Sequence, residues 1–100
     1  MPDEKGIAEI EAILGEYPWL LWHHCARSQT CHGTPGMPDF VIIGKHGEIW
    51  REVKPHYGEH PRLGQIAWKY GLLGAERDWD VWTPDDIASG RVRSEIEALL

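Results

Sequence analysis

The sequence predicts a mixed α/β domain in which helices flank a sheet. Three observations lead to this class. Apolar residues recur at helical spacing near both ends of the chain, short runs rich in Val, Ile and Trp lie between them, and Gly and Pro separate these runs. The predicted order is helix, three strands, helix, strand and terminal helices.

The N-terminal third of the chain supplies the first helix and strand. Residues 4–15 place four aliphatic side chains on one face and acids on the other, which predicts an amphipathic helix. Trp19–His24 is a short apolar and aromatic run, and we interpret it as a buried strand. Residues 25–38 contain two Gly and two Pro in their second half, which is typical of an irregular loop.

A hairpin and a helix follow. Asp39–Ile43 and Glu48–Lys54 are the predicted strands, and Gly44–Gly47 is the turn between them. Pro61 then opens a predicted helix that ends near Gly74. The apolar residues of this helix that share a face are Leu63, Ile66, Tyr70 and Leu73.

The last quarter of the chain supplies one strand and the terminal helices. Trp79–Trp82 has the composition of a fourth strand. Thr83 followed by Pro84 and two Asp residues predicts an N-cap and the first turn of a short helix. Ser94–Leu100 is a predicted final helix.

The hairpin predicts which polar side chains meet. If Lys45 and His46 form a two-residue loop, Asp39 lies directly opposite Glu52, with Cβ atoms about 5 Å apart on one face. Lys54 lies two residues beyond Glu52 and shares that face. A three-residue loop would instead set Asp39 opposite the next residue, Val53, so both registers stay open.

Two neighbouring carboxylates repel each other unless a cation lies between them. A hard divalent cation with oxygen ligands, such as Mg²⁺, suits Asp39 and Glu52. The adjacent amine of Lys54 could stabilise developing negative charge. This set of groups points to metal-assisted hydrolysis of a phosphodiester.

Composition narrows the class of protein. One hundred residues with 42% hydrophobic content fit a single domain, residues 1–100, and no apolar run is long enough to span a membrane. The polar N-terminus lacks an apolar signal region, so we expect a cytoplasmic protein with reduced cysteines. A net charge of −6 argues against a passive nucleic-acid coat protein but not against a nuclease.

These motifs carry a family resemblance. The stretch GTPGMPD at 33–39, EVK at 52–54, and Gln65 followed three residues later by Trp68 resemble the PD-(D/E)xK nuclease superfamily. Within it they are similar to the stand-alone VRR-NUC type of phages and mobile elements. The resemblance covers about residues 4–83, and it implies a restriction-endonuclease-like αβββαβ core. The fourth strand departs from the type, because it lacks a Val-Arg-Arg stretch.

The resemblance also implies roles for single residues. Asp39 and Glu52 would ligate Mg²⁺ (or Mn²⁺ as a substitute), with the Val53 carbonyl as third ligand. Lys54 would orient or deprotonate the attacking water, and Gln65 would reach the site from its helix. A glutamate of the first helix would contribute as well: Glu4 fits the spacing better, and Glu9 is the alternative.

The expected function is a Mg²⁺-dependent DNA endonuclease in a bacterial or phage-infected host cytoplasm. Arg62, Lys69 and Arg27 are the expected DNA contacts, because phosphate tracking needs basic residues near the site. The small size favours a homodimer, and the stand-alone relatives suggest branched substrates such as four-way junctions.

Two alternatives remain open. The chain could be an inactive DNA- or partner-binding module on the same fold. It could also be a small zinc-binding domain built on Cys25, Cys31 and the neighbouring histidines, although their spacing is poor for zinc. Four aromatic residues of the second predicted helix and the fourth predicted strand could stack on DNA bases, but we expect them to lie in the core. They are Trp68, Tyr70, Trp79 and Trp82.

Overall fold

The computed structural model describes residues 4–25, 31–56, 58 and 62–100. Their helices and strands follow the order predicted from the sequence. The elements are α1 (Glu4–Leu14), β1 (Leu21–His24), β2 (Phe40–Gly44), β3 (Gly47–Val53), α2 (Leu63–Gly74), β4 (Trp79–Trp82), α3 (Pro84–Ala88) and α4 (Arg91–Glu97).

The four strands form one mixed sheet in the order β1-β2-β3-β4. β2 is antiparallel to both β1 and β3, and β4 runs parallel to β3. The pairing of Gly44 with Gly47 leaves Lys45 and His46 as a two-residue loop. This confirms the first of the two predicted registers. The pairing of Phe40 with Arg51, continued by one residue, sets Asp39 opposite Glu52.

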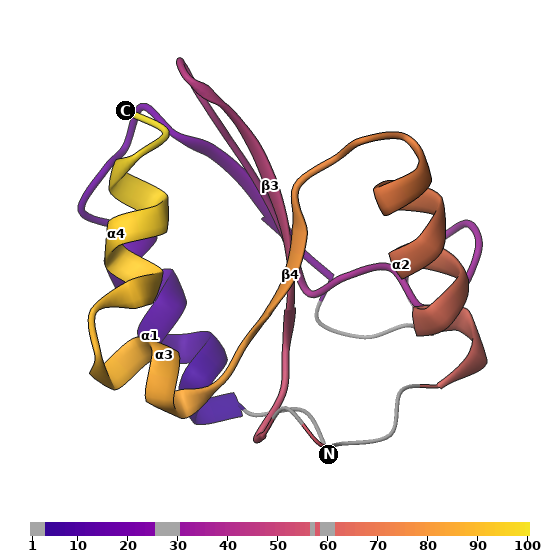
Figure 1. Cartoon of the computed structure of the whole chain (residues 1–100). Helices are drawn as coiled ribbons and strands as arrows, with labels where there is room; N and C mark the ends of the chain where they lie inside the picture. The colour runs from indigo at the N-terminus through magenta and orange to yellow at the C-terminus, as the bar shows by residue number, and fades with distance from the viewer. Residues whose placement is uncertain (1–3, 26–30, 57, 59–61) are drawn as a thin grey trace.

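Helices cover the two faces of the sheet unequally. α1, α3 and α4 lie together on one face, and α2 lies alone on the other (Figure 1). The hydrophobic core lies on the three-helix face, and its strand residues alternate along the chain as strand geometry requires. The core residues are Ile7, Ile10, Ile13, Leu14, Leu20, Phe40, Ile42, Ile49, Val53, Trp82, Val92, Ile96 and Leu99.

An ion-pair network joins α4 to the sheet on the core side. The buried guanidinium of Arg51 donates to Glu95 at 2.8 and 2.9 Å and to Asp78 at 3.0 Å. Glu95 also accepts from Trp82 Nε1 at 3.0 Å and from Arg91. Arg51 therefore serves the fold, and it lies on the sheet face opposite to Glu52.

The prediction that Trp19–His24 is a buried strand was wrong in two respects. β1 begins at Leu21, and Leu21 and Trp19 are each 68% exposed. The reason is the position of β1 at the edge of the sheet, where it has one neighbouring strand. An apolar run predicts a strand, but it does not distinguish an edge strand from a central one.

The expectation that Tyr70 of α2 is a core residue was also wrong, and the apolar face that Tyr70 shares with Leu63 is largely exposed. Leu63 is 85% exposed and Tyr70 is 65% exposed, whereas Leu72 is the buried residue of this helix. The helix starts at Leu63, after Arg62 as N-cap, and Pro61 lies outside the described residues. The face of α2 that meets the sheet is the one that carries Gln65 and Trp68, which contact β3 and the loop before β2.

Smaller differences concern the C-terminal helices. Thr83 caps α3 as predicted, with its N–H donating to Asp86 at 2.8 Å. The last helix runs over Arg91–Glu97, earlier than the predicted Ser94–Leu100. Among the described residues, no helix is long and apolar enough to cross a membrane.

Candidate active site

Asp39 is fixed from two sides at the point where β2 begins. Its Oδ2 accepts a hydrogen bond of 2.7 Å from the backbone N–H of Val53 in β3. Its backbone carbonyl lies 2.7 Å from Nδ1 of His24, and the His24 ring stacks on Phe40. The carboxylate is therefore held next to the end of β3 by three strands.

Glu52 and Lys54 project from β3 toward α2, where Gln65 connects them. Glu52 is 5% exposed, and its Oε1 accepts from Gln65 Nε2 at 3.3 Å. Lys54 Nζ donates to Gln65 Oε1 at 2.9 Å. The same Oε1 accepts the N–H of Arg62 at 3.0 Å, which fixes the amide at the first turn of α2. One amide thus sets the positions of an acid and an amine.

The loop before Asp39 packs against the start of α2 through two glycines. Gly36 has φ +95°, and a Cβ built there would lie 2.2 Å from the carbonyl carbon of Gly64. A Cβ on Gly64 would lie 2.6 Å from the carbonyl oxygen of Pro35. Only glycine permits this approach, which brings Gln65 to the site. Sequence reasoning missed Gly64, although a glycine directly before Gln65 in a helix was a signal.

Two stacked tryptophans lie next to the site, one on α2 and one on β3. Trp68 lies one turn after Gln65 and stacks on Trp50 of β3, with ring centroids 6.4 Å apart and planes inclined by 28°. Trp68 Nε1 donates to the carbonyl oxygen of Thr34 at 3.0 Å. Trp50 lies on the same strand face as Glu52, because the two residues are two positions apart on β3. The helix, the loop and β3 are therefore joined next to the acids.

The other predicted site residues lie elsewhere. Glu4 is exposed at the start of α1, and Glu9 lies on the same helix. Neither joins Asp39 and Glu52 in a group, because the described residues contain no cluster of three or more His, Cys, Asp or Glu placed to hold a metal. Assigning Glu4 to the site from the resemblance is therefore not supported by the geometry: α1 packs on the opposite sheet face.

The predicted DNA-contacting residues differ in their surroundings. Arg62 is exposed at the N-terminal end of α2, next to Gln65. Lys69 is half-buried, with its Nζ 5.1 Å from the ring centroid of Trp79 and 5.5 Å from that of Tyr70. Arg27 lies outside the described residues. Of the two that the structure describes, Arg62 is the cation placed directly beside the site.

The donor set fits a divalent cation with a preference for oxygen. Asp39 and Glu52 come from opposite positions of a hairpin, and the Val53 carbonyl adds a further oxygen at the same strand end. Mg²⁺ is commonly held by one or two carboxylates, while water and phosphate oxygens complete its coordination. A pair of acids is therefore sufficient, and a third acidic residue is not required.

The cysteines do not behave as expected. Cys25 and Cys31 form a disulfide, with Cα atoms 6.4 Å apart, where we expected reduced thiols. The disulfide joins the end of β1 to the loop that leads toward Asp39. A separation of six residues lets the chain return to the same place, but spacing alone did not reveal the pairing. Because both sulfurs are used, the zinc alternative loses its thiolate ligands.

No family model and no curated protein matches the chain. What the site can do therefore follows from its own residues. It combines two carboxylates, a lysine and a bridging amide at one end of a sheet, with an exposed arginine beside them.

Proposed function

We propose that this protein is a Mg²⁺-dependent DNA endonuclease of the PD-(D/E)xK superfamily, VRR-NUC type. The observation that carries the proposal is the bridge from Glu52 through Gln65 to Lys54, next to Asp39. The order of elements and the parallel pairing of β3 with β4 support a restriction-endonuclease-like core.

Each residue of the set has a chemical task in this proposal. Asp39, Glu52 and the Val53 carbonyl would hold Mg²⁺, which when bound polarises a phosphoryl oxygen and lowers the pKa of water. Lys54 donates to the oxygens of the phosphate, where negative charge develops, and orients the attacking water. Gln65 keeps Lys54 and Glu52 in position. Arg62, exposed at the start of α2, binds an adjacent phosphate.

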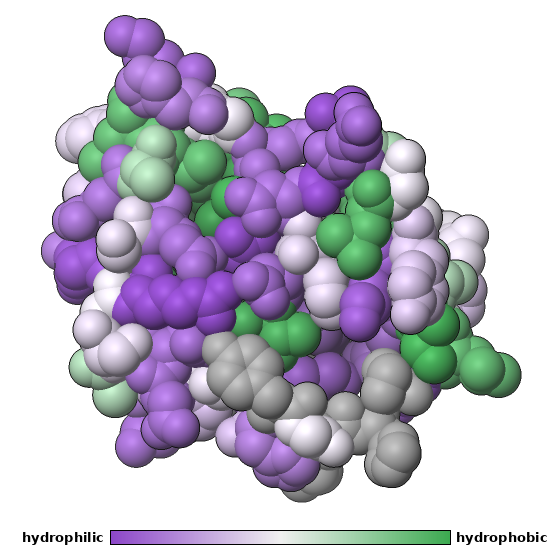
Figure 2. All heavy atoms as spheres, viewed as in Figure 1, coloured by the Kyte–Doolittle hydropathy of each residue, from purple (hydrophilic) through white to green (hydrophobic). Residues whose placement is uncertain are grey.

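We further propose that two copies of the chain act together on branched DNA. The support is an apolar stripe on the solvent side of α2, and apolar patches are visible over this part of the molecule (Figure 2). The stripe consists of Leu63, Ile66, Tyr70 and Leu73. Its spacing of three, four and three residues reads the same in both directions, so antiparallel packing of two α2 helices pairs Leu63 with Leu73 of the partner.

Charge does not oppose this pairing. Arg62 precedes the stripe and Glu76 follows it, so the antiparallel arrangement does not bring two copies of either residue together. Leu63→Glu should convert a dimer to a monomer in analytical ultracentrifugation. Leu21→Glu is the matched control, since Leu21 is also exposed but lies on β1. A wild-type protein that sediments as a monomer at every concentration contradicts the dimer.

The activity is tested on labelled four-way junction, flap and linear duplex DNA in Mg²⁺ and in Mn²⁺. We expect cleavage that EDTA abolishes, with junction or flap preferred. Asp39→Asn keeps an oxygen acceptor for the Val53 N–H and removes the charge, so it should abolish cleavage while the protein stays folded. Inactivity of the wild type on all three substrates in both metals, together with DNA binding, would favour the inactive module.

A further inference from the structure

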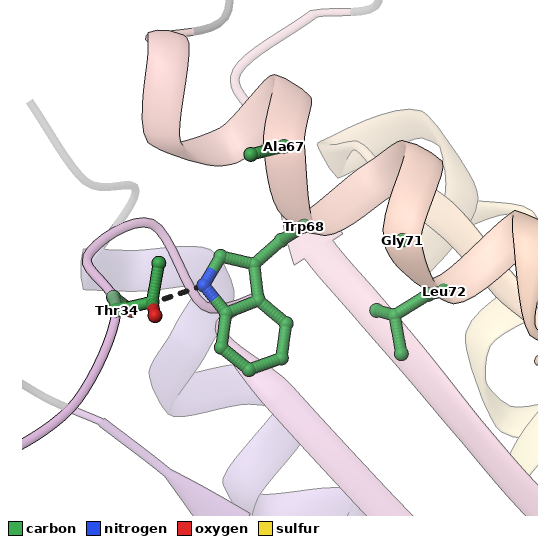
Figure 3. A pocket seen from close by; sticks show the side chains of 5 residues that line it. All are labelled: Thr34, Ala67, Trp68, Gly71 and Leu72. Atoms are coloured by element: carbon green, nitrogen blue, oxygen red, sulfur yellow. Dashed lines mark hydrogen bonds between the residues drawn. The ribbon is translucent and has the colours of Figure 1, made fainter.

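A small apolar pocket lies on α2 beside the candidate active site. It has a volume of about 310 Å³, and its lining residues are Thr34, Ala67, Trp68, Gly71 and Leu72. Figure 3 shows the indole of Trp68 spread across the pocket, with Thr34 on one side and Leu72 on the other. The hydrogen bond from Trp68 Nε1 to the Thr34 carbonyl fixes the plane of this ring.

The ring that lines the pocket is rigid and close to the reacting groups. Trp50 stacks on Trp68, and Glu52 lies two residues after Trp50 on β3. Gln65 precedes Trp68 by three residues, which is about 4.5 Å along a helix axis. A group in the pocket is thus about one turn of α2 from the amide that holds Lys54.

The chemistry of the lining selects the kind of ligand. None of the five residues is charged, so the pocket offers no ion pair to a phosphate or a carboxylate. It offers an aromatic surface that is held by the stacking of Trp50 and by the hydrogen bond to Thr34, and its volume is at the small end for ligand sites. A flat, uncharged ring system fits these properties. The cations that attract phosphate, Lys54 and Arg62, lie one to two turns of α2 away.

We propose that this pocket binds an unpaired DNA base next to the phosphate that is cleaved. The inference rests on the proposed function and names the substrate feature that the site selects. A nucleotide carries its charge on the backbone and a neutral ring on the base, which matches cations at the start of α2 and an apolar pocket further along it. Base stacking on aromatic side chains does not depend on sequence.

This binding mode has a consequence for substrate choice. A base can enter the pocket only after it leaves the helical stack, and that step costs least where the base is already unpaired. Flaps, single strands and junction points supply such bases, whereas intact duplex does not. The pocket therefore makes the enzyme selective for branched or single-stranded positions without reading sequence.

Filling the pocket tests the proposal. Gly71 lines the pocket, and a Cβ built on it meets nothing within 4 Å, so Gly71→Leu should add an apolar side chain at the pocket with no clash at its Cβ. Gly74→Leu is the matched control: the same substitution in the same helix, also in open space, but outside the pocket. Both changes replace a helical glycine, so neither should lower Tm.

The readout is independent of cleavage. A single-stranded 2-aminopurine oligonucleotide series, with the fluorescent base moved one position at a time, is titrated with protein in Ca²⁺. We expect strong quenching at one position for the wild type and Gly74→Leu. Gly71→Leu should remove that quenching and weaken binding about 10-fold, which is within the range for one stacked base. Trp68→Leu should also remove the quenching, and provides a second variant.

The outcomes separate this inference from the proposed function. Quenching that Gly71→Leu abolishes, in a protein that cleaves nothing in Mg²⁺, supports the pocket and rejects the endonuclease. Cleavage by the wild type with no quenching at any position, or with equal quenching and binding for wild type and Gly71→Leu, overturns the pocket and leaves the endonuclease intact.

Discussion

The Nζ atom of Lys54 lies 2.9 Å from Oε1 of Gln65, so the amine at the end of β3 is oriented by a side chain from α2. The same amide donates to Glu52 through its nitrogen. Because an amide has one acceptor end and one donor end, Gln65 can hold a cation and an anion at once. A charged side chain at this position could hold only one of them: an acidic residue would hold Lys54, and a basic residue would hold Glu52.

Replacing Gln65 with Met should therefore loosen both partners while keeping the length of the side chain. We expect cleavage to slow by about 10- to 100-fold, as for other residues that orient metal ligands by hydrogen bonding to them. The Mg²⁺ concentration for half-maximal activity should rise as well, because Glu52 loses its donor. A slower enzyme with an unchanged Mg²⁺ dependence would mean that Gln65 does not position Glu52.

The contact between Gly36 and Gly64 predicts a position-specific effect in one loop. Gly36→Ala adds a Cβ that would lie 2.5 Å from the backbone nitrogen of Gln65, so α2 must move away from the loop. Gly33→Ala is the control: Gly33 also has a positive φ, +127°, but a Cβ there meets nothing within 4 Å. Both substitutions should lower the free energy of unfolding by about 1–2 kcal/mol, because alanine is strained at a positive φ.

Only the change at Gly36 should lose more stability than this and also lower the cleavage rate, measured by urea unfolding and by single-turnover cleavage. Equal losses for the two variants would show that the approach of the loop to Gly64 does not position the site.

The buried network around Arg51 predicts a change in stability without a direct change in chemistry. Arg51→Met removes the buried guanidinium that donates to Glu95 and to the Asp78 carbonyl, and we expect a loss of about 3 kcal/mol in the free energy of unfolding. Arg77→Met is the matched control, since Arg77 is exposed and pairs with Glu48 at 3.3 Å. It should change stability by less than about 1 kcal/mol.

Both arginine variants should cleave DNA at the wild-type rate well below their melting temperatures. An equal loss of stability in the two would show that the Arg51 network contributes no more than a surface pair.

A surface pair makes the stability depend on pH. Arg93 donates to the Glu16 carboxylate at 2.8 and 3.0 Å, and this hydrogen bond lowers the pKa of Glu16 below 4.5. Because the folded-state pKa is the lower one, the stabilisation is present above the unfolded pKa and is lost as the pH falls through the folded pKa. Glu16→Gln should therefore lower Tm at about pH 7 but not at about pH 2.

High salt should reduce the difference, because Glu16 is exposed. A difference in Tm that stays constant from neutral to acid pH would mean that the effect of the substitution does not come from the charge.

The sequence predicted most of the features that local rules control. It left two hairpin registers open, and the structure has the one with the two-residue loop at Lys45 and His46, which places Asp39 opposite Glu52. Strand alternation put Lys54 and Trp50 on the same face as Glu52. The cap at Thr83 followed from its residue type and the proline after it.

The features that could not be predicted depend on contacts between distant segments. The side of α2 that faces the sheet is decided by Gln65, Trp68 and the approach of Gly64 to the loop, none of which affects the apolar pattern of the helix itself. Likewise, an apolar run does not indicate whether a strand is central or at the edge of a sheet. The presence of two cysteines does not indicate whether they form a disulfide. Helical periodicity therefore identified α2 and its apolar face, but it did not identify the face that packs on the sheet.

Single-turnover cleavage of a branched DNA by Lys54→Met, beside wild type and Lys5→Met, tests the central claim most directly. Lys5 is exposed on α1, so its variant controls for the loss of one positive charge. We predict that Lys54→Met retains its fold and loses at least about 100-fold in rate at saturating Mg²⁺, while Lys5→Met cleaves like the wild type. A Lys54→Met protein that cleaves at the wild-type rate would contradict the assignment of this cluster as the active site.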